Sequence, residues 1–334
     1  MDTKQQPGLG IFLALTTAVF WGALPIAIKQ VVEVMEPFTI VWYRFMMAAI
    51  GLGVILASRR QLPSLKLFRQ CRWLVLLIIA TGGLLGNFVF FSSSLQYLSP
   101  TVSQVIGQLS PVGMMVATVV ILKERIRITQ IIGAGMLICG LLLFFNTSLH
   151  QTFTHLTDYT LGVALGVCAA VVWVGYGVAQ KVLLRRMASQ PILLLLYTLC
   201  AIASLPLAKP AAIFQLNGWQ FACLLFCGVN TLVGYGALAE AMVRWQVAQV
   251  SALITLTPLF TLLFSILLAL AYPDMFVAPS LNLVGYAGAF VVVSGAMFSA
   301  IGHRWWPRRS EINLIAPKKQ SGERITEKVN EVCR

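Results

Sequence analysis

Charged side chains are scarce in this 334-residue chain. Only 10% of its residues are Asp, Glu, Lys or Arg, whereas 58% are hydrophobic. A soluble domain has about 25% charged and roughly 45–50% apolar residues. Since this mixture cannot cover a surface that faces water, it excludes a soluble globular protein and indicates one that lies mostly within a lipid bilayer.

Acidic residues are the scarcer of the two charge types, with 11 Asp and Glu against 24 Lys and Arg. A basic surplus favours nucleic-acid binding only when it forms a patch or a groove. Here the charges lie between long apolar runs and in the last thirty or so residues. We therefore expect topology signals and a lipid bilayer as partner, and no nucleic acid.

The chain also lacks the motifs of metal sites and hydrolases. Its seven cysteines form no CxxC pair, its three histidines lie outside the apolar runs, and it contains no HExxH or GxSxG. We expect no metal, no cofactor and no catalytic residue, so not an enzyme. A membrane-embedded enzyme stays as a rival class, because a helical membrane scaffold alone does not determine chemistry.

Ten apolar runs are each near the length of about 20 residues that crosses a bilayer as a helix. They lie at 9–28, 38–57, 73–91, 100–122, 128–145, 159–180, 191–208, 219–239, 247–271 and 281–301. We predict an all-α integral membrane protein with ten transmembrane helices. Residues 302–334 are polar and charged, and we expect them to form a basic tail.

Charge placement predicts the orientation. If the N-terminus lies inside the cell, 21 of the 24 Lys and Arg fall in inside segments, and only Lys29 and Lys209 lie at outside ends. An even number of spans with both termini in the cytoplasm satisfies the positive-inside rule at every loop.

The chain consists of two related halves. A shift of 147 positions places Gln104, Gln108 and Pro111 on Ser251, Thr255 and Pro258. A shift of 152 places Gly10, Trp21 and Lys29 on Gly162, Trp173 and Lys181. We predict five-helix repeats at 9–146 and 159–301. Because five is odd, the second repeat enters the membrane from the opposite side, which is typical of secondary transporters.

Several stretches resemble the EamA-type ten-helix carriers of the drug/metabolite transporter superfamily. They are AVFWG at 18–22, WYRF around Arg44, SLQYLSPTVSQVIGQLSPV followed by LKERI, IIGAGMLICG, and ALAEAMVRWQVAQVSALITLTPL. The resemblance covers nearly all of 9–301. It departs at Lys123, where the family's turn usually has Gly, and at Asp274 in the corresponding second turn. It implies a bacterial inner-membrane carrier that works by alternating access, often an exporter of amino acids or other small metabolites.

Polar side chains near broken helices are the first candidates for substrate binding, since transporter sites lie near the midplane where Gly or Pro interrupts a helix. Four of them share a helical face with a proline: Gln104, Gln108, Ser251 and Thr255. Cavity lining and interhelical hydrogen bonding both fit these residues. Pro111 and Pro258 are predicted hinges.

Aromatic and amide side chains deep within the spans are the second group of candidates. These are Trp21, Asn87, Trp173, Tyr176, Asn230 and Tyr235. The aromatic residues are interpreted as a wall for an amphipathic substrate, with helix packing as the alternative. The amides and Tyr235 are candidate donors to a polar substrate group.

Two charged residues have open roles. Arg44 is the only charge well inside a span; it reaches outward to Glu33 or Glu36, or it holds a substrate carboxylate in a bidentate fork. Glu240 is the acidic residue nearest a span centre and the candidate for proton coupling. Proton coupling is therefore either through Glu240 or absent, and we expect facilitated or weakly coupled export.

The leading functional hypothesis is export of amino acids or other small amphipathic metabolites. A nucleotide-sugar or phosphate-ester carrier is the alternative, and it requires two or more Lys or Arg inside the bundle. A membrane scaffold that does not transport is a further alternative. Gly82 with Gly86, and Gly162 with Gly166, permit close helix packing, either in a homodimer or within one chain.

Overall fold

A computed structural model describes residues 6–63, 70–120, 126–146, 158–245, 247–279, 281–302 and 311–312. The helices of the first half are α1 (Pro7–Val32), α2 (Pro37–Ser58), α3 (Cys71–Tyr97), α4 (Pro100–Gly107), α5 (Leu109–Val120) and α6 (Ile128–Phe144). Those of the second half are α8 (Asp158–Leu183), α9 (Ser189–Ser204), η2 (Leu205–Leu207), η3 (Pro210–Gln215), α10 (Gly218–Arg244), α11 (Val247–Ile254), α12 (Thr257–Ala271) and α13 (Leu283–Ile301). Strands β1 (Ile126–Arg127) and β2 (Glu311–Ile312) form one short antiparallel pair.

The long helices are apolar enough to span a membrane. Seven helical segments have both the length and the hydropathy that a transmembrane helix needs, and α6 and the apolar part of α13 are shorter apolar helices. An integral membrane protein built of helices is therefore what the described residues form. The predicted count of ten spans stays a prediction, because the fourth run is divided between α4 and α5 and the fifth and tenth runs correspond to these shorter helices.

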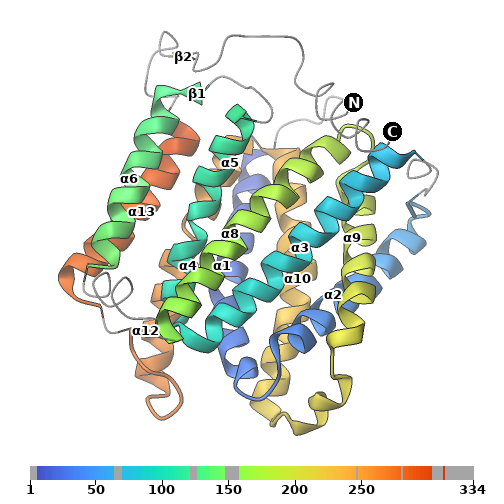
Figure 1. Ribbon diagram of the computed structural model, residues 1–334, viewed down its shortest axis with the longest axis horizontal. Helices are drawn as coiled ribbons and strands as arrows, with labels where there is room; N and C mark the ends of the chain where they lie inside the picture. Colours follow the sequence, from blue (N-terminus) through green and yellow to red (C-terminus); the bar gives the residue numbers. More distant parts are fainter. Residues whose placement is uncertain are drawn as a thin grey trace.

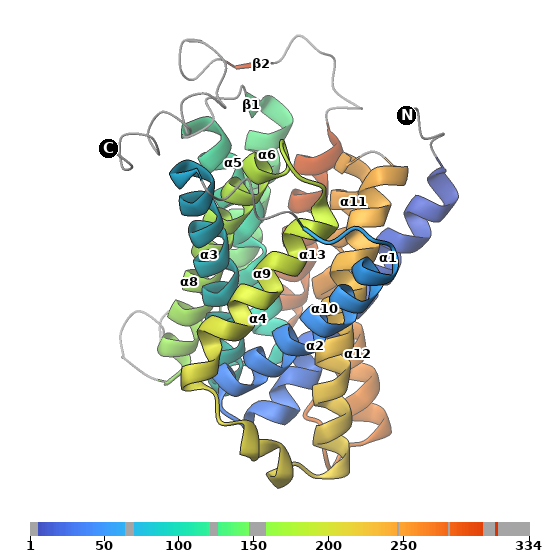
Figure 2. The ribbon, with the colours of Figure 1, turned by 90° about the vertical axis from the view of Figure 1, so that its right-hand side faces the viewer.

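The two halves run in opposite directions (Figures 1 and 2). Helix α1 runs downward from the upper end, whereas α8, its counterpart in the predicted repeat, runs upward. Contacts between distant segments agree with this arrangement. The backbone N–H of Gln6, before α1, donates to Arg244 at the end of α10 (3.1 Å), and Asn146 after α6 exchanges side-chain hydrogen bonds with Asn282 before α13 (3.2 and 3.0 Å).

Helix packing has the pattern that a two-fold relation between the halves requires. Helix α3 packs along α8, and α1 packs along α10, so the third helix of each half lies against the first helix of the other. Helices α6 and α13 pack together, as do α2 and α9. The division into repeats at 9–146 and 159–301 remains a prediction, and this packing is what it predicts.

The α3–α8 and α1–α10 contacts each use one asparagine and one glycine, and the two residue types exchange positions between the halves. Asn87 of α3 donates to a backbone carbonyl of α8 (2.9 Å), and Gly83, one turn earlier, allows α8 to approach closely. In α10, the shift of 147 places Asn230 at the position of Gly83 and Gly234 at that of Asn87. Asn230 donates to a backbone carbonyl of α1, and Gly234 lies against α1. Each helix pair therefore has one amide bridge and one close approach.

The small-residue pairs are used mainly within the chain. A Cβ built on Gly162 would lie 2.7 Å from Leu98, and one on Gly166 would lie 3.0 Å from Ile106. Gly86 lies near Val172, whereas Gly82 has nothing within 4 Å. Intramolecular packing thus accounts for three of these glycines, and the homodimer remains a prediction.

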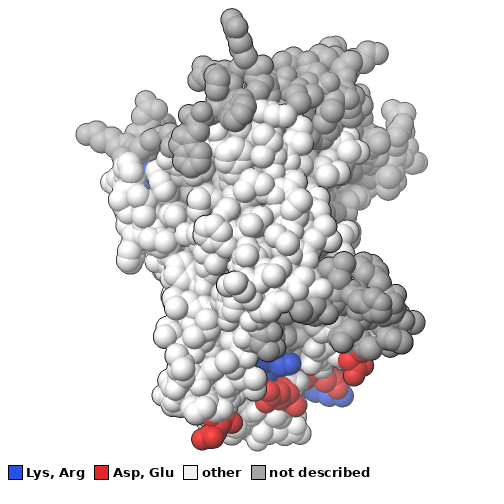
Figure 3. Space-filling model, turned by 90° about the vertical axis from the view of Figure 1, so that its left-hand side faces the viewer, with Lys and Arg blue, Asp and Glu red and all other residues white. Residues whose placement is uncertain are grey.

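Charges gather at the ends of the bundle. Figure 3 shows a face on which the visible described residues are uncharged over most of its height, with Lys, Arg, Asp and Glu near the ends. Lys209, before η3, pairs with Glu36, before α2 (2.6 Å). Most of the predicted tail 302–334, and the turn residue Lys123, lie outside the described residues.

Candidate functional site

The fourth predicted span is interrupted in its middle. Helix α4 ends at Gly107, and α5 begins at Leu109. At the break, Gln108 N–H donates to Val105 (3.1 Å), which is the tight bond of a 3₁₀ turn. Pro111 explains this geometry, because proline has no N–H and its ring clashes with the carbonyl four residues earlier, here that of Gly107.

The ninth span has the same break at the corresponding place. Helix α11 ends at Ile254, α12 begins at Thr257, and Leu256 N–H donates to Leu253 (3.1 Å). The carbonyl four residues before Pro258 is that of Ile254, where α11 ends. Helices interrupted at corresponding positions of two halves mark the binding site in many secondary transporters. Whether Pro111 and Pro258 act as hinges remains a prediction.

The two interrupted spans meet inside the bundle, since α4 packs against α12 and both pack against α1. Among the described residues, Gln104, Gln108 and Ser251 make no side-chain hydrogen bond to the protein. Thr255 differs, because its hydroxyl donates to the carbonyl of Ala252 (2.7 Å). The two roles predicted for this set, cavity lining and interhelical hydrogen bonding, both remain predictions.

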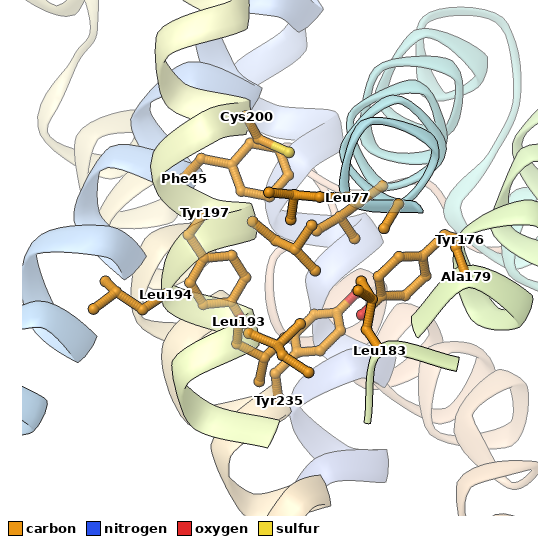
Figure 4. Packing of buried hydrophobic residues seen from close by; sticks show 14 of the residues in the cluster. Phe45, Leu77, Tyr176, Ala179, Leu183, Leu193, Leu194, Tyr197, Cys200 and Tyr235 are labelled. Carbon is orange, nitrogen blue, oxygen red and sulfur yellow. The ribbon is translucent and has the colours of Figure 1, made fainter. Parts of the chain in front are cut away.

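A cluster of aromatic rings, the aromatic cluster, lies where α1, α8, α9 and α10 converge. It comprises Trp21, Trp173, Tyr176, Tyr197 and Tyr235. Tyr235 is central, with ring centroids at 5.1 Å from Trp21, 6.4 Å from Trp173 and 6.3 Å from Tyr197. Trp173 lies 4.9 Å from Tyr176. In Figure 4 the hydroxyl ends of Tyr176 and Tyr235 point toward each other. The structure thus brings together four aromatic residues predicted from the sequence.

Arg44 of α2 adjoins this cluster and is 2% exposed. Its Nε donates to Thr231 Oγ1 (3.2 Å), and its guanidinium carbon lies 4.2 Å from the ring centroid of Phe88. No carboxylate pairs with Arg44 within the part of the chain that the structure describes. The predicted reach toward Glu33 or Glu36 is not observed, since Arg44 points into the bundle.

An unpaired guanidinium in this environment favours an anionic ligand. Burying a charge costs several kcal/mol unless it is paired. The face of Phe88 and the hydroxyl of Thr231 compensate only in part, because a guanidinium has five N–H donors and a carboxylate can accept two of them in parallel. A group with two acceptor oxygens, such as a carboxylate, could therefore pair with the guanidinium at this position.

The two amides have structural partners. Asn87 and Asn230 both donate to the backbone of a neighbouring helix, as described above. Asn230 is fully buried, and its Oδ1 has no hydrogen-bond partner. Asn230 was predicted to donate to a substrate, but its free polar atom, Oδ1, can only accept a hydrogen bond.

Glu240 lies near the end of α10, close to the upper end of the bundle. Its carboxylate forms an ion pair with Arg244, one turn on, and accepts a hydrogen bond from Gln190 of α9 (3.2 Å). Its side chain is 38% exposed. The structure thus places Glu240 in a partly exposed ion pair near the end of α10 and not in the aromatic cluster.

Three neighbours of Arg44 were not predicted from the sequence: Phe88, Tyr197 and Thr231. The internal repeat could have indicated two of them, because each has an aromatic counterpart in the other half. Phe88 is the counterpart of Tyr235 at the shift of 147, and Tyr197 matches Tyr43 at a shift of 154. Thr231 has Leu84 as its counterpart and offered no such signal.

Comparisons with known proteins agree with this architecture. The chain is 70% identical to the "Uncharacterized inner membrane transporter YhbE" of Escherichia coli, over 96% of this chain and 100% of that protein. It is 21% identical to a "Probable amino-acid metabolite efflux pump" of Salmonella typhimurium, over 88% and 95%. A crystal structure of a protein with 20% identity shares the fold, with a TM-score of 0.61 over 90% of this chain and 99% of that one.

These relatives and the apolar helices identify a multi-pass protein of the inner membrane. The sequence profile of the EamA-like transporter family matches residues 8–146 and again residues 160–301. The two matches coincide closely with the two halves whose helices run in opposite directions. The chain belongs to the EamA-like transporter family.

Proposed function

We propose that this protein exports small amphipathic metabolites that carry a carboxylate, amino acids among them, by alternating access. The observation that carries the proposal is Arg44, a buried guanidinium beside the aromatic cluster that pairs with no carboxylate among the described residues. The cation would hold the substrate carboxylate, and the rings would contact its apolar part. The free amides of Gln104 and Gln108, at the break between α4 and α5, would supply further polar contacts.

The arrangement of the helices supports a transport mechanism. Two halves of opposite direction, each with a span broken before a proline, allow one half to rock against the other around a central site. The name of the Salmonella relative, "Probable amino-acid metabolite efflux pump", supports the substrate class and the direction of transport. A scaffold without transport would satisfy its interior amides internally, whereas the amides of Gln104, which is partly exposed, and Gln108, which is buried, have no protein partner in the described structure.

The orientation of the chain in the membrane is proposed from charge placement. Of the described residues, Arg59, Arg60, Arg185 and Arg186 lie at the end of the bundle where α1 begins. We place this end in the cytoplasm by the positive-inside rule, with both termini there. A phosphate-ester carrier fits less well, because Arg44 is the only Lys or Arg buried in the described spans.

Transport by purified protein tests the proposal. In proteoliposomes preloaded with an unlabelled amino acid, counterflow of the radiolabelled compound should exceed that of protein-free vesicles. The panel should compare each amino acid with its amine and its methyl ester, since only the free acid can occupy Arg44. Equal transport of acid and ester, or of neither by folded protein, would contradict the proposal.

Glu240→Gln should leave the response of transport to an imposed pH gradient unchanged. The carboxylate is paired with Arg244 at the end of α10, and an exposed ion pair is worth only about 0–1 kcal/mol. The same proteoliposomes, with an inside-acid and then an inside-alkaline gradient, give the measurement. If the variant loses a gradient response that the parent shows, Glu240 carries protons and this expectation is wrong.

A further inference from the structure

Two arginines converge on one indole ring at the upper end of the bundle. Trp73, in the first turn of α3, is 4% exposed, and its indole N–H donates to the side chain of Gln70 (3.1 Å). The guanidinium carbon of Arg72 lies 5.2 Å from the ring centroid, and that of Arg186, beyond the end of α8, lies 6.0 Å from it. A buried, hydrogen-bonded ring thus orders two cations from different helices.

This pair of arginines has no acidic partner in the described part of the chain. Two cations held near one ring repel each other, and contact with the ring offsets this only by about 0.5–1 kcal/mol for each cation. The N-terminus of α3 adds positive potential, since its first turn has no acidic residue and no side chain caps it. Gln70, at the cap position, uses its side chain on Trp73 instead. An anion bound here would therefore be attracted by both arginines and by the N-terminus of α3.

The surface next to the arginines is apolar and exposed. Leu74, two residues after Arg72, is 43% exposed, and Ile78, one turn further, is 60% exposed. Leu184, two residues before Arg186, is 43% exposed. A soluble phosphate would gain nothing from these side chains, whereas the acyl chains of a lipid would cover them.

We propose that Arg72, Arg186 and Trp73 form a binding site for the phosphate headgroup of an anionic phospholipid. Basic groups between transmembrane helices at the cytoplasmic surface bind the headgroups of such lipids. Tryptophan is also enriched at the membrane–water interface, where these headgroups lie. The site lies apart from Arg44 and does not depend on the proposed substrate. Only the naming of the cytoplasmic leaflet rests on the proposed orientation.

Native mass spectrometry of delipidated full-length protein tests the site. Phosphatidylglycerol, cardiolipin and phosphatidylethanolamine would be titrated in separate arms, with inorganic phosphate as a fourth. We expect the parent protein to bind an anionic lipid more tightly than phosphatidylethanolamine. The double substitution of Arg72→Gln and Arg186→Gln should weaken anionic-lipid binding roughly thirtyfold. This factor corresponds to about 1 kcal/mol for each arginine at a membrane surface.

The matched control is the double substitution of Arg59→Gln and Arg185→Gln, which removes two exposed cations at the same end without touching Trp73. It should retain the affinity of the parent to within a few-fold. Equal losses in the two double variants would mean diffuse attraction and overturn the site. Competition by inorganic phosphate would also overturn the lipid site, because it would show that the arginines bind a soluble anion. A parent protein without preference for anionic lipid would overturn it even if a variant failed to fold.

Discussion

Arg44→Gln should lower the transport efficiency for a carboxylate substrate by about 10- to 100-fold while the protein stays folded. Hydrogen bonds to a charged group are worth about 1.5–3 kcal/mol, and this substitution removes the donors that a carboxylate would accept. The loss should appear in kcat/KM measured by counterflow in proteoliposomes. The methyl ester of the substrate should be affected little, since it has no carboxylate.

Stability separates this role from a structural one. Arg44 is buried with one side-chain hydrogen bond, to Thr231, and no described carboxylate. Replacing such a cation by a neutral side chain removes a desolvation cost, so the thermal midpoint should hold or rise. If Arg44 serves only to join α2 to α10, the midpoint should fall and transport should fall only with the amount of folded protein.

Two matched variants complete the test. Arg44→Lys keeps the charge but loses the planar fork, so its efficiency should lie between those of the parent and Arg44→Gln. Thr231→Val removes the acceptor for Nε and should have a smaller effect than either. Substrate at one hundred times Kd should stabilise the parent by about 2.7 kcal/mol and so raise its thermal midpoint, but it should not raise that of Arg44→Gln. Equal ligand stabilisation of parent and variant would place the carboxylate elsewhere.

The broken spans were predictable because their cause is local. Pro111 and Pro258 stand in mid-span, and proline acts on the carbonyl four residues before it, so the positions of the breaks follow from the chain itself. The opposite directions of the two halves were also predictable, because an odd number of spans per repeat requires inversion. Both inferences depend on spacing along the chain and on no contact between distant residues.

The direction of Arg44 was not predictable in this way. A long side chain about six residues from a helix end can reach the interface or turn inward, and the choice depends on how α2 is rotated against α10. The guanidinium contacts Thr231 of α10 and Phe88 of α3, and packing of distant segments brings both residues to it. The sequence indicated a charge at membrane depth but not its partner.

The roles of Asn87 and Asn230 could not be predicted from the sequence either. Their depth in the spans suggested donors to a substrate, yet both amides donate to the backbone of a neighbouring helix. The repeat contained the explanation, because each asparagine is matched with a glycine in the other half. Recognising it required knowing that α3 lies on α8 and α1 on α10, which is a property of the fold.

Helices α6 and α13 approach each other closely through glycines. A Cβ on Gly133 would lie 2.6 Å from the carbonyl oxygen of Gly295 and 2.6 Å from the backbone nitrogen of Ser299. One on Gly295 would lie 2.7 Å from the nitrogen of Leu137. These neighbours are backbone atoms, which cannot turn aside as a flexible side chain can, so any larger residue must push the helices apart.

Gly133→Ala should therefore destabilise the protein by about 1–3 kcal/mol, the usual cost of overpacking, even though alanine is the better helix former. Gly135→Ala, two residues along α6, is the matched control, since Gly135 is exposed and a Cβ there meets nothing within 4 Å. It should be neutral or stabilising by up to about 1 kcal/mol. Thermal unfolding in one detergent, followed by size-exclusion chromatography, measures both. Equal midpoints for the two variants would show that α6 and α13 do not pack through Gly133 in the membrane protein.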